Sequence, residues 1–300
     1  MKKQVRPAAL STVWLRAILV IAICGAGLMG YAWLDTSQPA AQVSNRDLVI
    51  TRIMDRTVRV EVEHGFGTGN LVTRKTQDGR TVHLVLTAAH VVESCRSVVP
   101  GLAGPYIKWL PCKVSIPVYQ EGQLVGIRTF AADVVQYSNK DTGQDLALLL
   151  VHAEGFTSAT TEFYLDKRLP GIGQELLHVG CMFGDFHSFT TGVLSQYGRT
   201  ILGRLFDQTT TIIYPGSSGG GLFLPDGRYI GMASMLRTGG VGFVTPIRRI
   251  LEWSTKAGCR WVLDPGVQAP SLDKLTQWSV ENDGSALPLP AACDEPDPEG

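Results

Sequence analysis

Short runs of strand-forming residues, separated by turn residues, recur along the chain from residue 57 to residue 245. Residues 57–63 (TVRVEVE) alternate apolar and polar side chains, as a half-buried strand does. Asp226-Gly227 is a strong hairpin signal between two such runs. Many short strands joined by Gly-rich turns are typical of a β-sandwich or of paired β-barrels, so we expect an all-β domain. The other predicted strands are residues 71–73, 82–86, 130–137, 146–151, 175–181, 189–195, 221–224, 229–236 and 241–245.

One helix is predicted late in the chain. It has Pro246 in its first turn, apolar residues at helical spacing (Ile247, Ile250 and Leu251), and Gly258 as its stop signal. The composition is that of a folded chain, because 44% of the residues are hydrophobic and 18% are charged. The 27 basic residues balance the 27 acidic ones, and no basic tract stands out. This balance argues against a protein that binds nucleic acid through phosphate contacts.

The N-terminal region predicts a membrane anchor. Residues 17–34 (AILVIAICGAGLMGYAWL) carry no charge over 18 positions, close to the roughly 20 that a spanning helix needs. The nearby basic residues all precede this run, which places residues 1–16 in the cytoplasm and the rest outside it. Residues 35–45 are predicted as a linker, and the body of the protein as periplasmic or extracellular. The alternative is a signal peptide, cleaved near Ala40 and Ala41, and a secreted protein.

Five cysteines follow the predicted anchor: Cys95, Cys112, Cys181, Cys259 and Cys293. An exported compartment permits disulfides, so Cys95 could pair with Cys112, and Cys259 with Cys293. Spacing alone does not fix the connectivity. No CxxC pair is present, and we expect neither a metal nor a cofactor.

A histidine follows one predicted strand. Residues 87–90 (TAAH) come directly after the apolar run 84–86, so the strand would deliver His90 onto a turn packed by two alanines. A catalytic imidazole needs such support, because it must be held in one orientation and tautomer. The alternative is an ordinary histidine at a strand end.

A carboxylate precedes another strand. Asp145 lies directly before the apolar residues 146–150, which would draw it toward a buried position. A buried carboxylate needs a compensating partner, and an imidazole N–H is one. The alternative is an acid on a surface loop.

A serine lies in a glycine-rich segment, residues 216–220 (GSSGG). Serine is a poor nucleophile until a base removes its proton. The glycines would let the backbone fold tightly and direct N–H groups to one point, as an oxyanion hole requires. The alternative is a flexible Gly/Ser turn.

Together these motifs give the order His, Asp, Ser on strand margins of an exported all-β domain. The chain resembles the trypsin-like (chymotrypsin-fold) serine peptidases, and looks closest to the bacterial HtrA/Deg-type branch. Further segments that carry this resemblance are residues 65–72 (GFGTGNLV), 179–184 (VGCMFG), 191–195 (TGVLS), 214–220 (YPGSSGG) and 242–247 (GFVTPI).

The resemblance implies two six-stranded antiparallel β-barrels of the chymotrypsin type and a C-terminal helix, preceded here by one transmembrane helix. The peptidase domain would span residues 46–257. Residues 258–300 would form a C-terminal extension, partly disordered and too short for the PDZ domain common in HtrA proteins. His90 would be the general base and then the acid, Asp145 would orient it, and Ser218 would be the nucleophile. The N–H groups of Gly216 and Ser218 would form the oxyanion hole.

The family's substrate pocket is expected at Ile212, Ile213, Tyr214, Ser234, Gly239 and Gly240. No acid lies at the position that selects Lys or Arg, so an apolar or small P1 side chain is expected. Residues 232–236 would pair with the substrate backbone as an added strand.

We therefore expect a membrane-anchored serine endopeptidase whose partners are protein or peptide substrates. Two departures from the family pattern are Ser217, where Asn is frequent, and Gly221, where Pro is frequent. They keep open a second hypothesis, a catalytically silent module that binds peptides in the same cleft. A third hypothesis, a metal-binding envelope protein, has no cluster of ligand-spaced histidines to support it.

Overall fold

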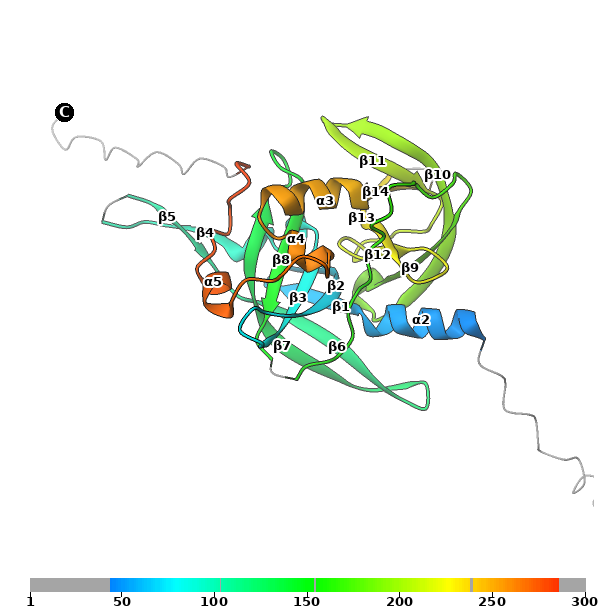
Figure 1. The fold of residues 1–300 in the computed structure, drawn as a ribbon, viewed down its shortest axis with the longest axis horizontal. Coiled ribbons are helices and arrows are strands. Elements are labelled where there is room, and N and C mark those ends of the chain that lie inside the picture. Colours follow the sequence, from blue (N-terminus) through cyan, green and yellow to red (C-terminus); the bar gives the residue numbers. More distant parts are fainter. Residues whose placement is uncertain (1–43, 103, 154, 238–239, 286–300) are drawn as a thin grey trace, which may run out of the picture. The chain divides into compact units, whose positions relative to one another are not determined.

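The structure, a computed structural model, describes residues 44–285 except residues 103, 154, 238 and 239 (Figure 1). The predicted anchor at residues 17–34 lies outside the described residues. Among the helices that are described, none is long and apolar enough to cross a membrane.

The first six-stranded sheet closes into a barrel in the order β1-β2-β3-β8-β7-β6, with every neighbouring pair antiparallel. Its strands are β1 (Thr57–Val62), β2 (Gly65–Lys75), β3 (Thr81–Thr87), β6 (Cys112–Gln120), β7 (Gln123–Ser138) and β8 (Leu146–Val151). Strand β8 is apolar throughout and fully buried, because one face lies inside the barrel and the other is covered by the chain around it.

The second sheet closes in the order β10-β11-β14-β13-β12-β9, also antiparallel. Its strands are β9 (Glu175–Gly180), β10 (Ser188–Ile201), β11 (Arg204–Thr209), β12 (Gly221–Phe223), β13 (Tyr229–Arg237) and β14 (Val241–Pro246). The expectation of an all-β domain with two six-stranded barrels is confirmed.

Helices border the barrels. Helix α3 (Ile247–Lys256) begins directly after β14, as expected, and its buried Ile250 and Trp253 pack into the core. The chain turns after α3 at Gly258, whose φ of +71° is in the left-handed region that favours glycine. Short helices α4 (Arg260–Leu263) and α5 (Leu272–Thr276) follow, while α2 (Asn45–Asp55) precedes β1.

The segment between residues 95 and 129, which the sequence left unassigned, has two parts. Strands β4 (Arg96–Val99) and β5 (Tyr106–Trp109) pair as a separate two-stranded ribbon. Strands β6 and β7 then form a long hairpin, which extends beyond the barrel in Figure 1. Within the residues that the structure describes, three single turns of 3₁₀ helix are also present: η1 (Ala89–Val91), η2 (Glu93–Cys95) and η3 (Met182–Gly184).

Candidate active site

His90 is positioned by the end of strand β3. The strand finishes at Thr87, and the fully buried Ala88 and Ala89 lead into η1, which carries His90. Alanine side chains are small enough to let this turn pack against the barrel. The His90 side chain is 31% exposed, so one edge of the imidazole reaches the surface.

Asp145 holds that imidazole. Its carboxylate lies at the start of β8, and its Oδ2 is 2.9 Å from Nδ1 of His90. The backbone N–H of His90 also donates to Oδ1 of Asp145, at 2.9 Å. Asp145 has a φ of +57°, an unusual conformation for a residue other than glycine, which the loop before it enforces. The carboxylate is thus buried with two donors, so its burial is compensated.

The pKa of His90 is raised above its ordinary value. Burial alone would lower it, but the hydrogen bond and the negative charge of Asp145 favour the protonated ring, and Glu93 adds to the effect. Lys140 opposes it weakly. Asp145 therefore makes the imidazole of His90 more basic than an ordinary histidine.

Ser218 lies in a loop of the second barrel that requires glycine. Gly216 and Gly219 have φ values of +93° and +87°. A Cβ at Gly219 would lie 2.1 Å from the carbonyl oxygen of Thr68, so no other residue fits there.

His90, Gly216 and Ser218 line one small cavity of about 240 Å³. The residues from the first barrel that line it include Phe66 at the start of β2. Within the described part of the chain, no hydrogen bond joins Ser218 to His90. The cavity brings the hydroxyl and the imidazole to the same site, at the junction of the two barrels.

The peptide group before Gly216 is fixed by a contact from η3. The N–H of Phe183 donates to the carbonyl of Pro215 at 2.8 Å. Because a trans peptide directs its C=O and N–H to opposite sides, the N–H of Gly216 points away from Phe183. It donates to no protein acceptor within the described residues.

The peptide group before Ser218 is fixed in a similar way. The carbonyl of Ser217 accepts a hydrogen bond from the N–H of Gly220 at 2.8 Å. The N–H of Ser218 therefore points to the other side of the peptide plane, and it too has no acceptor in the described chain. Two oriented N–H groups without a protein acceptor can bind an oxyanion.

Sequence reasoning missed two residues that join this loop to the first barrel, Thr68 and Asn70 of strand β2. Thr68 donates from its hydroxyl to the carbonyl of Gly216 at 2.6 Å, and its N–H donates to the carbonyl of Ser218 at 2.9 Å. Asn70 donates from Nδ2 to the carbonyl of Gly219 at 2.8 Å. Both side chains are fully buried. Their only signal in the sequence was a polar residue within an otherwise Gly-rich apolar strand.

The two departures from the family pattern fit this loop. Ser217 is fully buried, and its Oγ accepts a hydrogen bond from the N–H of Tyr214 at 3.2 Å. A Cβ at Gly221 would lie 2.6 Å from Oδ1 of Asn70. Glycine at that position therefore leaves room for the Asn70 side chain.

The predicted pocket residues differ in exposure. Ile212 and Tyr214 are 48% and 43% exposed, whereas Ile213 is buried in the core of the second barrel. Tyr214 stacks on Phe183, with the ring centroids 5.2 Å apart. Ser234 is buried, Gly240 is exposed, and Gly239 lies outside the described residues.

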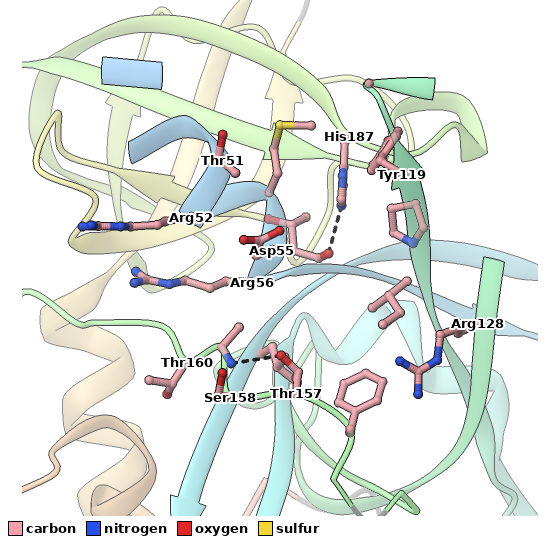
Figure 2. A pocket seen from close by; sticks show the side chains of 18 residues that line it. Thr51, Arg52, Asp55, Arg56, Tyr119, Arg128, Thr157, Ser158, Thr160 and His187 are labelled. Atoms are coloured by element: carbon pink, nitrogen blue, oxygen red, sulfur yellow. Dashed lines mark hydrogen bonds between the residues drawn. The ribbon is translucent and has the colours of Figure 1, made fainter. Parts of the chain in front are cut away.

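A larger cavity, of about 920 Å³, lies between the end of α2, the β6–β7 hairpin and residues 156–160. Figure 2 shows the side chains that line it. Three of the residues around it are the arginines Arg52, Arg56 and Arg128. At its edge, Nε2 of His187 lies 3.1 Å from the carbonyl oxygen of Thr57, the contact drawn as a dashed line in Figure 2. None of the predicted site residues lines this cavity.

The cysteines that the structure describes are all buried free thiols: Cys95, Cys112, Cys181 and Cys259. Cys293, the expected partner of Cys259, lies outside the described residues. In the same part of the chain, no three His, Cys, Asp or Glu side chains lie close enough to hold a metal ion.

Comparison with known proteins agrees with this architecture. Residues 67–232, more than half of the chain, match the family model of the trypsin-like peptidase domain. The chain therefore belongs to the trypsin-like peptidase family, as the sequence motifs predicted.

Curated relatives carry the name probable periplasmic serine endoprotease DegP-like. The one from Halomonas elongata is 27% identical over 248 residues, covering 80% of this chain and 45% of the relative. One from Pseudomonas putida (strain W619) is 36% identical over 107 residues, covering 35% of this chain and 22% of the relative. The chain thus spans less than half of the length of these relatives.

Among solved structures, the crystal structure of the serine endoprotease from Yersinia pestis is similar. The TM-score is 0.53 at 21% identity, covering 71% of this chain and 66% of that chain. This similarity supports the fold.

Proposed function

We propose that this chain is a serine endopeptidase that hydrolyses peptide bonds through an acyl-enzyme on Ser218. The observation that carries the proposal is the His90–Asp145 pair, with Nδ1 and Oδ2 2.9 Å apart, because His90 lines the same cavity as Ser218. Its membership of the trypsin-like peptidase family supports the same chemistry.

In the first step, Nε2 of His90 takes the hydroxyl proton as Oγ of Ser218 bonds to the substrate carbonyl carbon. Asp145 keeps Nδ1 protonated and stabilises the imidazolium that forms. The negative charge that develops on the carbonyl oxygen is bound by the N–H groups of Gly216 and Ser218.

The tetrahedral intermediate then collapses. The C–N bond breaks, the amine leaves with the proton from His90, and an ester to Ser218 remains. A water molecule repeats the sequence: it loses a proton to His90 and attacks the ester. Ser218 leaves as the alcohol, with the acid product released. The hydrogen bond from Ser218 to His90 would form in the Michaelis complex, where catalytic hydrogen bonds commonly tighten.

The proposed substrates are proteins or peptides with an apolar or small P1 side chain. The exposed Ile212 and Tyr214 support this preference, because both offer apolar surface near the Ser218 loop. Strand β13, which contains Ser234, would pair with the substrate backbone. Gly239 and Gly240 would border the pocket.

The proposed location is the periplasm or the extracellular side, in agreement with the name of the relatives. We propose residues 17–34 as the membrane anchor, since the run carries no charge and basic residues precede it. Residues 1–16 would be cytoplasmic, residues 35–45 a linker, residues 46–257 the peptidase domain and residues 258–300 an extension of it.

The experiment is digestion of an unfolded protein, such as reduced casein, by the full chain and by its Ser218→Ala variant. We expect cleavage by the parent and none by the variant, with the peptide products sequenced to read the P1 preference. If a folded parent binds casein without cleaving it, the endopeptidase proposal fails and the silent peptide-binding hypothesis replaces it.

A further inference from the structure

The loop that ends at Asp145, residues 139–145, is stabilised partly by hydrogen bonds within the loop itself. Oδ1 of Asn139 accepts hydrogen bonds from the N–H groups of Asp141 and Thr142, at 2.8 and 3.1 Å. The carbonyl of Asn139 accepts from Gly143 and Asp145, at 2.9 and 3.3 Å. These bonds fix the shape of the loop, but they do not fix its place on the barrel.

Arg249 of α3 attaches the loop at Gln144, donating from Nε to Oε1 at 2.7 Å, and a segment far along the sequence supplies a second attachment. Residues 279–285, here called the C-terminal strap, run beside the end of β7. The N–H of Tyr137 donates to the carbonyl of Val280 at 2.8 Å, and Nε2 of Gln136 donates to the carbonyl of Ser279 at 3.2 Å. The strap therefore follows the strand that leads into the Asp145 loop.

Ser285, at the end of the strap, bonds the loop itself. Its Oγ accepts a hydrogen bond from the N–H of Asn139 at 2.9 Å, and its carbonyl accepts from the hydroxyl of Thr142 at 2.6 Å. The Ser285 hydroxyl in turn donates to Oδ1 of Asp283 at 2.6 Å. A Cβ at Gly143 would lie 2.6 Å from Cβ of Ser285, so loop and strap are in close contact there.

The middle of the strap contacts the other side of the site. Glu281 forms a largely buried ion pair with Arg96 at 2.6 Å, with side chains 8% and 12% exposed. Arg96 directly follows η2, the short turn that comes after the one carrying His90. The strap thus bonds the segment that follows His90 and the loop that precedes Asp145.

From these contacts we propose that the C-terminal strap positions Asp145 against His90, with Ser285 as the positioning residue that acts through the Asp145 loop. The inference rests on the proposed function, and it gives the C-terminal extension a role in catalysis that the peptidase motifs do not assign. Ser285 touches neither the substrate nor the reacting atoms.

A pH profile separates positioning from general stability. The charged groups that act on His90 are Asp145, Glu93 and Lys140, and the buried Arg249 of α3 acts on Asp145. If Asp145 shifts, the pKa of His90 falls toward its ordinary value, and the pH midpoint of serine reactivity falls with it. A variant that is only less stable loses active protein, but its midpoint stays where it was.

The test is the rate of fluorophosphonate labelling against pH for the full-length parent, Ser285→Ala, Thr142→Val and a matched control. The control is Asp273→Asn, which removes an exposed ion pair with Arg80 elsewhere in the extension. The melting temperature of each variant defines conditions in which all of them are folded.

We expect Ser285→Ala and Thr142→Val each to lower the plateau rate about tenfold or more and to lower the midpoint, with the control unchanged. Thr142→Val gives the same test if Ser285→Ala does not fold. If the parent labels, and the folded variants label with the same pH midpoint and plateau rate as the parent, the positioning role alone is overturned. A folded parent that does not label would contradict the proposed function as well.

Discussion

The hydroxyl of Thr68, in the first barrel, donates a hydrogen bond to the backbone carbonyl of Gly216, in the second, at 2.6 Å. The same oxygen accepts a hydrogen bond from the N–H of Cys181 at 2.8 Å. One buried side chain therefore joins β2, the end of β9 and the Ser218 loop. The geometry of the loop that carries the proposed oxyanion donors depends on the packing of the two barrels against each other.

Thr68→Val should leave the carbonyl of Gly216 and the N–H of Cys181 without their partner. We expect the labelling rate to fall about ten- to a hundredfold and the free energy of unfolding to fall by about 1–3 kcal/mol. Labelling kinetics and urea denaturation measure the two effects. Thr68→Ser keeps the hydroxyl and should retain most of the rate. Equal rates for the Val and Ser variants would show that the hydrogen bond does not support the loop.

Gly219→Ala tests whether the Ser218 loop tolerates a side chain. The added Cβ would lie 2.1 Å from the carbonyl oxygen of Thr68 and 2.3 Å from Oγ1 of Thr87, so the loop must shift. We expect labelling of Ser218 to be lost. Gly227→Ala is a matched control, because Gly227 also has a φ of +87°. There the added Cβ would have its nearest neighbour 3.3 Å away, so it meets no such clash. Labelling by a folded Gly219→Ala variant at the parent rate would contradict the geometry of the loop.

Asp145→Asn removes the charge that raises the pKa of His90. In the parent, the pKa of His90 is higher than its ordinary value of about 6.5, and His90 can accept a proton only when it is neutral. The labelling rate should therefore rise with pH through a midpoint above about 6.5. The variant should show a lower midpoint and a plateau rate about a thousandfold or more below the parent. Labelling rates from pH 5 to pH 9 measure both. A midpoint that does not move would show that Asp145 does not act on His90.

His178 should make the protein sensitive to acid. It is fully buried, and burial lowers its pKa to about 4, although its Nδ1 lies 2.8 Å from the carbonyl oxygen of Gly221. Between about pH 6.5 and pH 4, the unfolded chain takes up a proton that the folded chain does not. The contribution of His178 to stability is therefore present above pH 6.5 and is lost as the pH falls, by about 1.4 kcal/mol per pH unit.

The check is urea denaturation at several pH values from 4 to 7. His178→Gln retains a hydrogen-bond donor and does not titrate, so the difference in slope between parent and variant isolates this residue. Between pH 7 and pH 4, we expect the free energy of unfolding to fall by about 3 kcal/mol less in the variant than in the parent. If the free energy of unfolding falls with pH equally in the parent and in His178→Gln, the buried, neutral state of His178 is contradicted.

The strands that the sequence predicted well are those with a clear burial pattern. Strand β8 coincides with the predicted apolar run at residues 146–151, because both of its faces are buried. Strand β11 and helix α2 were missed, since polar residues are mixed through both segments and only a few side chains are buried. Their conformation depends on the partner strands or on the barrel surface.

The candidate site was predictable only in part. Residues such as His90 and Ser218 have local signals, because their chemistry requires a supporting turn or flanking glycines. The signal at Thr68 is weak, a polar residue in a Gly-rich strand, since its partner Gly216 lies 148 positions away. Ile213 lies beside the serine loop in the sequence, and its role in the substrate pocket stays a prediction. Its side chain is buried in the core of the second barrel.

The most direct test of the central claim is fluorophosphonate labelling of the folded full chain, with the labelled peptide identified by mass spectrometry. Such a reagent bonds to an activated serine and needs no knowledge of the substrate. The account predicts one adduct, on Ser218, that is absent from the His90→Ala and Ser218→Ala variants. Labelling at another serine, or a folded parent that does not react, would contradict it.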